Sequence, residues 1–174
     1  MIVVKALPTV LQNFIWPGTR LILKFFGHFK INGVENVAGL PRGVIFAVNH
    51  SSELDAILVP ASLPFLSRHL GMFYTSREQS FYQNSSWRQK IYGGWLFKIW
   101  GAYPVAVGVN DYEKSLVTHI ELVKEGRSVC IFPEGLKTRT GSLGPAKGGV
   151  AYLALKTGKP VVPVAISGVF GMQF

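Results

Sequence analysis

The stretch VIFAVNHSSELDAILV, residues 44–59, carries the clearest structural signal in the chain. Its first five residues, Val44–Val48, are all apolar, a pattern typical of a strand that is buried on both faces. Asn49 and His50 end this run, and a helical pattern follows over residues 52–63. A buried strand that leads directly into a helix predicts an α/β protein with parallel strands.

The rest of the chain repeats this alternation of apolar runs and helical segments. A helix is expected over 111–125, with Leu116, Ile120 and Val123 on its buried side, and another over 146–156. We therefore predict an α/β fold in which a largely parallel central sheet is flanked by helices. The expected strands are 44–48, 71–75, 102–107, 128–132 and 161–166.

We expect two parts, an N-terminal segment over residues 1–28 and an α/β domain over residues 29–174. A chain of 174 residues is long enough for one domain with a hydrophobic core. The last expected strand begins at Val161, and only a few residues follow it before Phe174. Because so little chain is left to cover that strand, we expect the sequence to be truncated at its C-terminus.

The N-terminal segment shows two apolar patterns at helical spacing, one on each side of Pro17. Because proline breaks most helices, the pattern predicts a hairpin of two short amphipathic helices. Aromatic and basic residues favour a position on a membrane surface, and the alternative is a helix packed on the core. The apolar positions are Leu7, Val10, Leu11, Phe14 and Ile15, then Ile22, Phe25, Phe26 and Phe29.

The overall composition favours an anionic, lipid-like partner. Lys and Arg number 18 against 9 Asp and Glu, so the formal net charge is +9, and 48% of residues are hydrophobic. The mean hydropathy is +0.28 and the isoelectric point is about 9.9. The sequence shows neither a basic helix suited to a DNA groove nor paired Cys/His spacing, so we expect no nucleic-acid partner.

Compartment signals are consistent with a membrane-associated protein on the cytoplasmic face. No stretch reaches the ~18 uncharged apolar residues that a spanning helix needs, and no signal peptide is evident. The single cysteine, Cys130, lies inside an apolar run, so it indicates a buried side chain in a reducing compartment.

Chemically active side chains follow several expected strands at their carboxyl ends. His50 follows the first strand, Arg77 the second and Glu134 the fourth, with Lys137 and Arg139 shortly after Glu134. Ligands of open α/β sheets bind at this edge. An imidazole, a carboxylate and cations there predict a site for an anionic substrate.

His50 and Asp55 have the spacing of a catalytic pair and also of a helix cap. A carboxylate in the first helical turn can accept the proton of one imidazole nitrogen and leave the other nitrogen free as a base. The base would then act on a substrate hydroxyl, since no strong protein nucleophile is evident. Ser52 and Asp55 also have capping-box spacing, and spacing alone leaves both interpretations open.

The other histidines, His28, His69 and His119, have no partner at a useful spacing. We expect His119 on the solvent side of its helix and His69 in a polar connection. All three are predicted to be structural or solvated.

Five short motifs resemble those of the glycerolipid acyltransferases, in the order of that family. The set is most similar to the bacterial-type 1-acyl-sn-glycerol-3-phosphate (lysophosphatidate) acyltransferases. The motifs are NHSSELD at 49–55, TSREQSF at 75–81, GAYPVAVG at 101–108, FPEGLKTRTGSLGPAKGG at 132–149 and KPVVPVAISG at 159–168.

The resemblance implies an acyltransferase of phospholipid biosynthesis. His50 would deprotonate the hydroxyl of a lysophosphatidate-like glycerolipid, and Asp55 would orient the imidazole. The acyl group would come from acyl-CoA or acyl-carrier protein as co-substrate. The chemistry implied needs no cofactor, no metal and no covalent acyl-enzyme.

The resemblance also implies an acceptor pocket around the FPEG residues. Glu134 and Gly135 would line it, and Glu134 would orient cations or a glycerol hydroxyl, because a carboxylate repels phosphate. Backbone amides near Gly148 and Gly149 would add a weaker anion site. The remaining expected substrate-binding residues are Asn49, Arg77, Lys137, Arg139 and Lys147.

Two positions depart from the family pattern. Ala106 and Val107 stand where the family usually has an arginine that contacts the acceptor phosphate. Lys137 stands where it usually has another arginine, and lysine keeps the charge without the bidentate geometry. Another lyso-lipid or glycerol-3-phosphate is therefore an alternative acceptor.

Two other classes of function stay open from the sequence. A non-catalytic lipid-binding protein on the same fold would keep the basic, aromatic surface and would not need His50 and Asp55 together. A hydrolase with Ser51 or Ser52 as nucleophile is less favoured, because the chain has no Gly-x-Ser-x-Gly motif.

Overall fold

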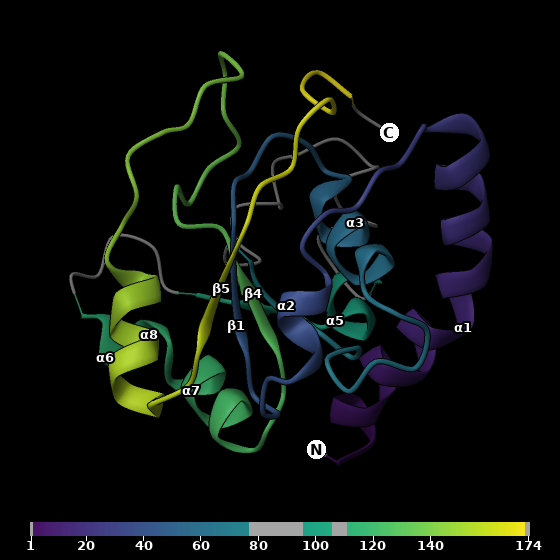
Figure 1. Cartoon of the computed structure of the whole chain (residues 1–174). Coiled ribbons are helices and arrows are strands. Elements are labelled where there is room, and N and C mark those ends of the chain that lie inside the picture. Colours follow the sequence, from purple (N-terminus) through teal and green to yellow (C-terminus); the bar gives the residue numbers. More distant parts are fainter. Residues whose placement is uncertain (1, 77–95, 106–110, 173–174) are drawn as a thin grey trace.

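The computed structural model describes residues 2–76, 96–105 and 111–172. At its centre lies a five-stranded sheet in the order β3-β2-β4-β1-β5, with every neighbouring pair parallel. The expected parallel sheet with flanking helices is thus confirmed (Figure 1). The strands are β1 (Ile45–Val48), β2 (Phe73–Ser76), β3 (Ala102–Pro104), β4 (Val129–Ile131) and β5 (Val161–Val164).

Alternate residues of the central strands enter two cores, one on each face of the sheet. Ile45 and its neighbour Val129 enter one core, while Phe46 and its neighbour Cys130 enter the other. The first face is covered by α6 (Tyr112–Ser115), α7 (Val117–Lys124) and α8 (Gly149–Thr157). The second is covered by α1 (Ile2–Phe26), α2 (Glu35–Ala38), α3 (Asp55–Ser62) and α5 (Phe97–Trp100) (Figure 1).

The N-terminal segment forms one helix of 25 residues, α1, so the predicted hairpin is wrong. Pro17 lies inside this helix and removes one backbone hydrogen bond. Contacts to a distant segment hold the helix on both sides of the proline. Trp16 Nε1 donates to the Leu63 carbonyl at 3.0 Å, and the Arg20 guanidinium donates to the Ala61 carbonyl.

No helix in the described ranges combines the length and the hydropathy needed to cross a membrane.

Gln12 fixes α1 to the edge of the second core through a buried side chain that makes four hydrogen bonds. Its Nε2 donates to the carbonyls of Met72 and Trp100 at 2.9 and 3.0 Å. Its Oε1 accepts from the N–H groups of Gly71 and Met72 at 3.0 and 2.9 Å. These bonds satisfy every donor and acceptor of the amide, so α1 docks through a polar contact on its inner side.

The helix expected over 111–125 is divided at Leu116 into α6 and α7. Leu116 has non-helical dihedral angles, φ −108° and ψ 9°, which mark the boundary between the two helices. His119 lies three residues after Leu116 and four before Val123, on the side that faces the core, and it is 0% exposed. The expectation that His119 faces solvent is therefore wrong.

Candidate active site

His50 and Asp55 meet at the carboxyl end of β1. His50 follows the strand, Asp55 begins α3, and His50 Nδ1 lies 2.9 Å from Asp55 Oδ2. The Asp55 side chain is completely buried, whereas that of His50 is 22% exposed. The pair thus places a shielded carboxylate behind an imidazole that reaches solvent.

A single oxygen of Asp55 both holds the turn that leads into α3 and orients the imidazole. Oδ2 accepts the N–H groups of Ser51 and Ser52 at 2.7 and 2.9 Å, in addition to its contact with His50. Ser52 Oγ in turn accepts the N–H of Leu54 at 3.1 Å. The two interpretations of Asp55 therefore coexist, because the bonds that hold the turn before α3 and the candidate catalytic pair share one oxygen. Because Oδ2 serves as an acceptor, Nδ1 carries the imidazole hydrogen and Nε2 keeps its lone pair.

The imidazole is held flat against Phe132. The two rings stack with centroids 4.1 Å apart and planes 18° apart. Within the described ranges, Nε2 has no hydrogen-bond partner. This geometry leaves Nε2 available to a substrate hydroxyl.

Cys130 lies in β4 and is completely buried. Burial first, and then the charge of Asp55, raise the pKa of its thiol well above the ordinary value. The thiol is therefore an inert packing group, as the apolar run around it predicts.

Glu134 holds the backbone of the site with both of its oxygens. Oε1 accepts the His50 N–H at 2.9 Å, and Oε2 accepts the Gly144 N–H at 2.8 Å. The resemblance implied that this carboxylate orients cations or a glycerol hydroxyl. In the structure each oxygen has a backbone N–H partner, so Glu134 positions the backbone of the site, and its contact with a substrate stays a prediction.

The expected basic residues differ in their partners. Lys137 Nζ lies 2.9 Å from Glu53 Oε1, so its charge is partly neutralised. Arg139 and Lys147 are exposed and form no ion pair within the described part of the chain. Lys147 lies over Gly135, where a Cβ would come within 3.0 Å of Nζ and where φ is +71°. Both unpaired cations, Arg139 and Lys147, lie in the loop that carries Glu134.

The segment 165–172 forms part of the site that sequence reasoning missed. Asn49 Oδ1 accepts the Ile166 N–H at 2.6 Å, and Asn49 Nδ2 donates to the Ile166 carbonyl at 2.9 Å. Ser52 Oγ donates to the Met172 carbonyl at 2.9 Å. Asn49, an expected substrate-binding residue, thus fastens this segment to β1. The motif over 159–168 was the signal that pointed to it.

Neither candidate serine is placed as a nucleophile. Ser51 Oγ accepts from Asn49 Nδ2 at 3.0 Å, and Ser52 Oγ bonds to the Met172 carbonyl. Neither hydroxyl contacts the imidazole of His50, whose Nδ1 is already bonded to Asp55. This arrangement argues against the hydrolase alternative.

Arg77, Ala106 and Val107 lie outside the described residues. Among the residues that are described, no group of three or more His, Cys, Asp or Glu side chains is arranged to hold a metal ion.

The other histidines lie outside the site. His119 Nε2 lies 3.2 Å from the Tyr74 carbonyl, and burial lowers the pKa of His119 to about 4. His69 is also buried, and mainly for that reason its pKa is lowered. His28 is exposed. His69 and His119 are structural, as expected, although His119 is buried.

Comparison with known proteins extends the argument from these motifs to most of the chain. The family model described as Acyltransferase matches residues 28–167. The chain is 33% identical over 159 residues to the 1-acyl-sn-glycerol-3-phosphate acyltransferase of Bacillus subtilis, covering 91% of this chain and 72% of that protein. It is 32% identical over 142 residues to the chloroplastic 1-acyl-sn-glycerol-3-phosphate acyltransferase BAT2 of Brassica napus, covering 79% of this chain.

The chain spans only 37% of the Brassica protein and 38% of the similar Arabidopsis thaliana chloroplastic enzyme LPAT1. The crystal structure of the 1-acyl-sn-glycerophosphate acyltransferase PlsC from Thermotoga maritima has the same fold, with a TM-score of 0.60 and 21% identity. That similarity covers 91% of this chain and 60% of the Thermotoga chain.

Proposed function

The chain belongs to the Acyltransferase family, and from that premise we propose that it acylates a lysophosphatidate-like glycerolipid in phospholipid biosynthesis. The acyl donor is acyl-CoA or acyl-carrier protein, and the product is a diacylated glycerolipid. The observation that carries this proposal is the buried Asp55 carboxylate behind His50, with Nε2 of the imidazole facing outward.

In this mechanism, His50 Nε2 takes the proton from the acceptor hydroxyl. The oxygen attacks the thioester carbonyl carbon, the carbon–sulfur bond breaks, and the departing thiol receives the proton from the imidazolium. Asp55 stabilises the imidazolium through the 2.9 Å contact to Nδ1. General base catalysis of this kind contributes roughly 10²–10⁴-fold.

The acceptor headgroup binds at the loop that carries Glu134. Arg139 and Lys147 provide unpaired positive charge there, and the Thr138 N–H donates to the His50 carbonyl at 2.8 Å. This bond ties the basic loop to the catalytic histidine. An acceptor whose phosphate meets these cations brings its free hydroxyl toward Nε2.

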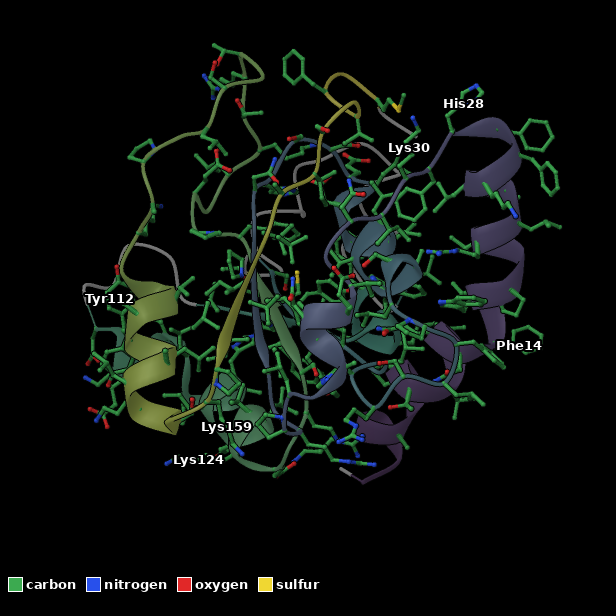
Figure 2. All side chains as sticks on the ribbon, in the orientation of Figure 1. Phe14, His28, Lys30, Tyr112, Lys124 and Lys159 are labelled. Carbon is green, nitrogen blue, oxygen red and sulfur yellow. The ribbon has the colours of Figure 1, made fainter. Side chains whose placement is uncertain are left out.

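The outer side of α1 provides the membrane contact of the proposed enzyme. Its exposed residues are large and apolar, and Figure 2 shows Phe14 on the side of α1 that faces away from the sheet. Lys24 and Lys30 add exposed positive charge near its end. The unpaired Cys130 supports the reducing, cytoplasmic face. The apolar outer residues are Leu7, Val10, Phe14, Leu21, Ile22, Phe25 and Phe26.

The test uses purified protein in liposomes and a matched His50→Ala variant. Acyl-CoA or acyl-carrier protein is offered with lysophosphatidate, other lyso-phospholipids or glycerol-3-phosphate, while thiol release and the lipid product are followed. We expect thiol release that depends on lysophosphatidate and disappears in the variant.

Each other outcome has a defined meaning. Preference for another lyso-lipid or for glycerol-3-phosphate would revise the acceptor, as the two departures at Val107 and Lys137 allow. Equal rates for the two proteins, or no dependence on any acceptor, would overturn the catalytic proposal and leave a lipid-binding protein.

A further inference from the structure

Four large apolar side chains lie exposed beside the candidate active site and are not used by the proposed mechanism. They belong to two segments, the loop 132–148 and the segment 165–172, which lie together at the top of the molecule in Figure 1. We call these four residues the apical rim. They are Leu136, Leu143, Phe170 and Met172, with exposed fractions of 49%, 79%, 52% and 51%.

The two segments of the apical rim contact each other and the site. Phe170 packs against the loop at Gly141, where a Cβ would lie 3.3 Å from its ring. The other connections are backbone-anchored: Thr138 N–H donates to the His50 carbonyl, and Ser52 Oγ donates to the Met172 carbonyl. The apical rim is therefore joined to both ends of the stretch that carries the catalytic histidine.

The charge around the apical rim is positive. Arg139 and Lys147 are exposed and unpaired within the described ranges, while Lys137 is paired with Glu53. Glu134, the carboxylate of this loop, is bonded to backbone N–H groups. Exposed apolar side chains among free cations fit an anionic bilayer, which offers both negative headgroups and an apolar interior. An acidic protein surface would satisfy the cations and leave the apolar side chains without a partner.

We propose that the apical rim inserts into the surface of an anionic bilayer, so that the mouth of the active site opens directly onto the lipid. This contact is additional to that of α1 and rests on the proposed function, because it supplies the acceptor. A lyso-lipid then reaches His50 by lateral diffusion and keeps its acyl chain in the lipid phase.

The test places a polarity-sensitive fluorophore on single cysteines. The native Cys130 is completely buried and stays unlabelled, so it needs no replacement. Three variants are compared: Leu143→Cys in the apical rim, Phe26→Cys on α1, and Leu155→Cys on α8 as the matched control. Leu155 is 85% exposed and lies on the helix that covers the opposite face of the sheet from α1.

Labelled proteins are mixed with phosphatidylcholine vesicles with or without about 30% phosphatidylglycerol. We expect the emission of the label at 143 to rise about twofold or more and shift to the blue on the anionic vesicles, as an apolar environment requires. The label at 26 should respond as well, and the label at 155 should not.

Three results would overturn the inference, and they separate it from the proposed function. A response of the label at 26 without a response at 143 would support the membrane contact of α1 and contradict insertion of the apical rim. A response at 143 that equals the response at 155 would indicate non-specific adsorption. If labels at 26 and 143 both fail to respond, neither surface binds lipid, whatever the transferase assay shows.

A kinetic arm measures the consequence for substrate entry. Leu143→Asp should lower the rate on vesicle-embedded lyso-lipid about tenfold relative to the rate on a short-chain, monomeric acceptor, because it places a charge in the lipid contact. Leu155→Asp should leave this ratio unchanged. An unchanged ratio for Leu143→Asp would contradict lateral entry. Absence of transferase activity in the protein without substitutions would contradict the proposed function itself.

Discussion

Two histidines in this molecule, His50 and His119, differ in two chemical respects that decide their roles. Each bonds one ring nitrogen to a protein oxygen: His50 Nδ1 to a buried carboxylate at 2.9 Å, His119 Nε2 to the Tyr74 carbonyl at 3.2 Å. The second nitrogen of His50 faces outward, whereas Nδ1 of His119 is buried without a partner among the described residues. The carboxylate stabilises an imidazolium at His50. At His119 the hydrogen bond to the Tyr74 carbonyl also favours the charged ring, but burial outweighs it and lowers the pKa.

A catalytic histidine of this kind therefore needs both an exposed free nitrogen and a charged oxygen on the bonded one. Burial lowers the pKa of His119 to about 4, so the folded protein holds this ring neutral. His50 has the buried anion and the open side that a general base needs. The following variants test this contrast, in order of decreasing expected effect.

Replacing Asp55 should cost both rate and stability. In Asp55→Ala the imidazole loses its orienting partner, and the N–H groups of Ser51 and Ser52 lose their acceptor. We expect kcat to fall about 10³-fold and the free energy of unfolding to fall by about 2 kcal/mol. Acyl-transfer kinetics and urea denaturation measure the two effects. His50→Ala is the control, since it should lose the rate and keep most of the stability.

The contrast between the two histidines would fail if Asp55→Ala retained its rate, because the carboxylate would then only hold the turn before α3.

His119 should make the fold sensitive to acid without affecting catalysis. Its pKa is about 4 in the folded state, against an ordinary value of 6.5 when the chain is unfolded. Between these values the unfolded state binds a proton that the folded state does not, so stability falls as pH drops from 6.5 toward 4. The loss from this residue approaches about 3 kcal/mol and is complete below the folded-state pKa.

His119→Gln keeps a donor for the Tyr74 carbonyl and cannot titrate. Denaturation curves across this pH range should show a smaller slope in the variant, with the residual slope arising from other groups such as His69. Its kcat at neutral pH should match that of the unmodified protein. An unchanged slope would mean that His119 is not held neutral in the folded state.

Glu134→Gln should separate positioning from acceptor binding. Glutamine retains only one acceptor oxygen, so either the His50 N–H or the Gly144 N–H loses its partner. We expect kcat to fall about 10- to 100-fold, as for the loss of a hydrogen bond to a charged group, with little change in the KM of the acceptor. A large rise in KM with kcat preserved would instead return Glu134 to the acceptor pocket.

The smallest effect is expected at the exposed ion pair of Glu53 and Lys137. Its side chains are 47% and 39% exposed, so Glu53→Gln should change the free energy of unfolding by less than about 1 kcal/mol. The variant frees the Lys137 charge, and the KM of an anionic acceptor should fall about twofold. A rise in KM would show that Glu53 itself contributes to binding.

The central strands of the sheet were predictable because both of their faces are buried. The apolar runs around β1 and β4 follow from that burial, and their bounds agree with the structure to within a few residues. The continuity of α1 was not predictable, because local rules place a break at Pro17. Trp16 and Arg20 hold the helix through carbonyls more than 40 residues away in sequence, at Leu63 and Ala61.

Within the site, the contact between His50 and Asp55 was predictable because five residues and one helical turn join them. The backbone contacts of Glu134 were not predictable. Its partners are backbone N–H groups, and every residue except proline carries one, so the sequence does not single them out. The burial of His119 could have been predicted from spacing, because His119 lies three residues after Leu116 and four before Val123, both of which were expected on the buried side.

The double use of Asp55 has a consequence for how such a chain would change over evolutionary time. Because the same oxygen holds the turn before α3 and orients His50, selection for a folded protein alone is enough to retain the carboxylate. The imidazole has no comparable structural duty. A lineage that lost acyl transfer and kept the fold would therefore lose His50 first. A relative with the aspartate and without the histidine would then be one that has lost catalytic activity.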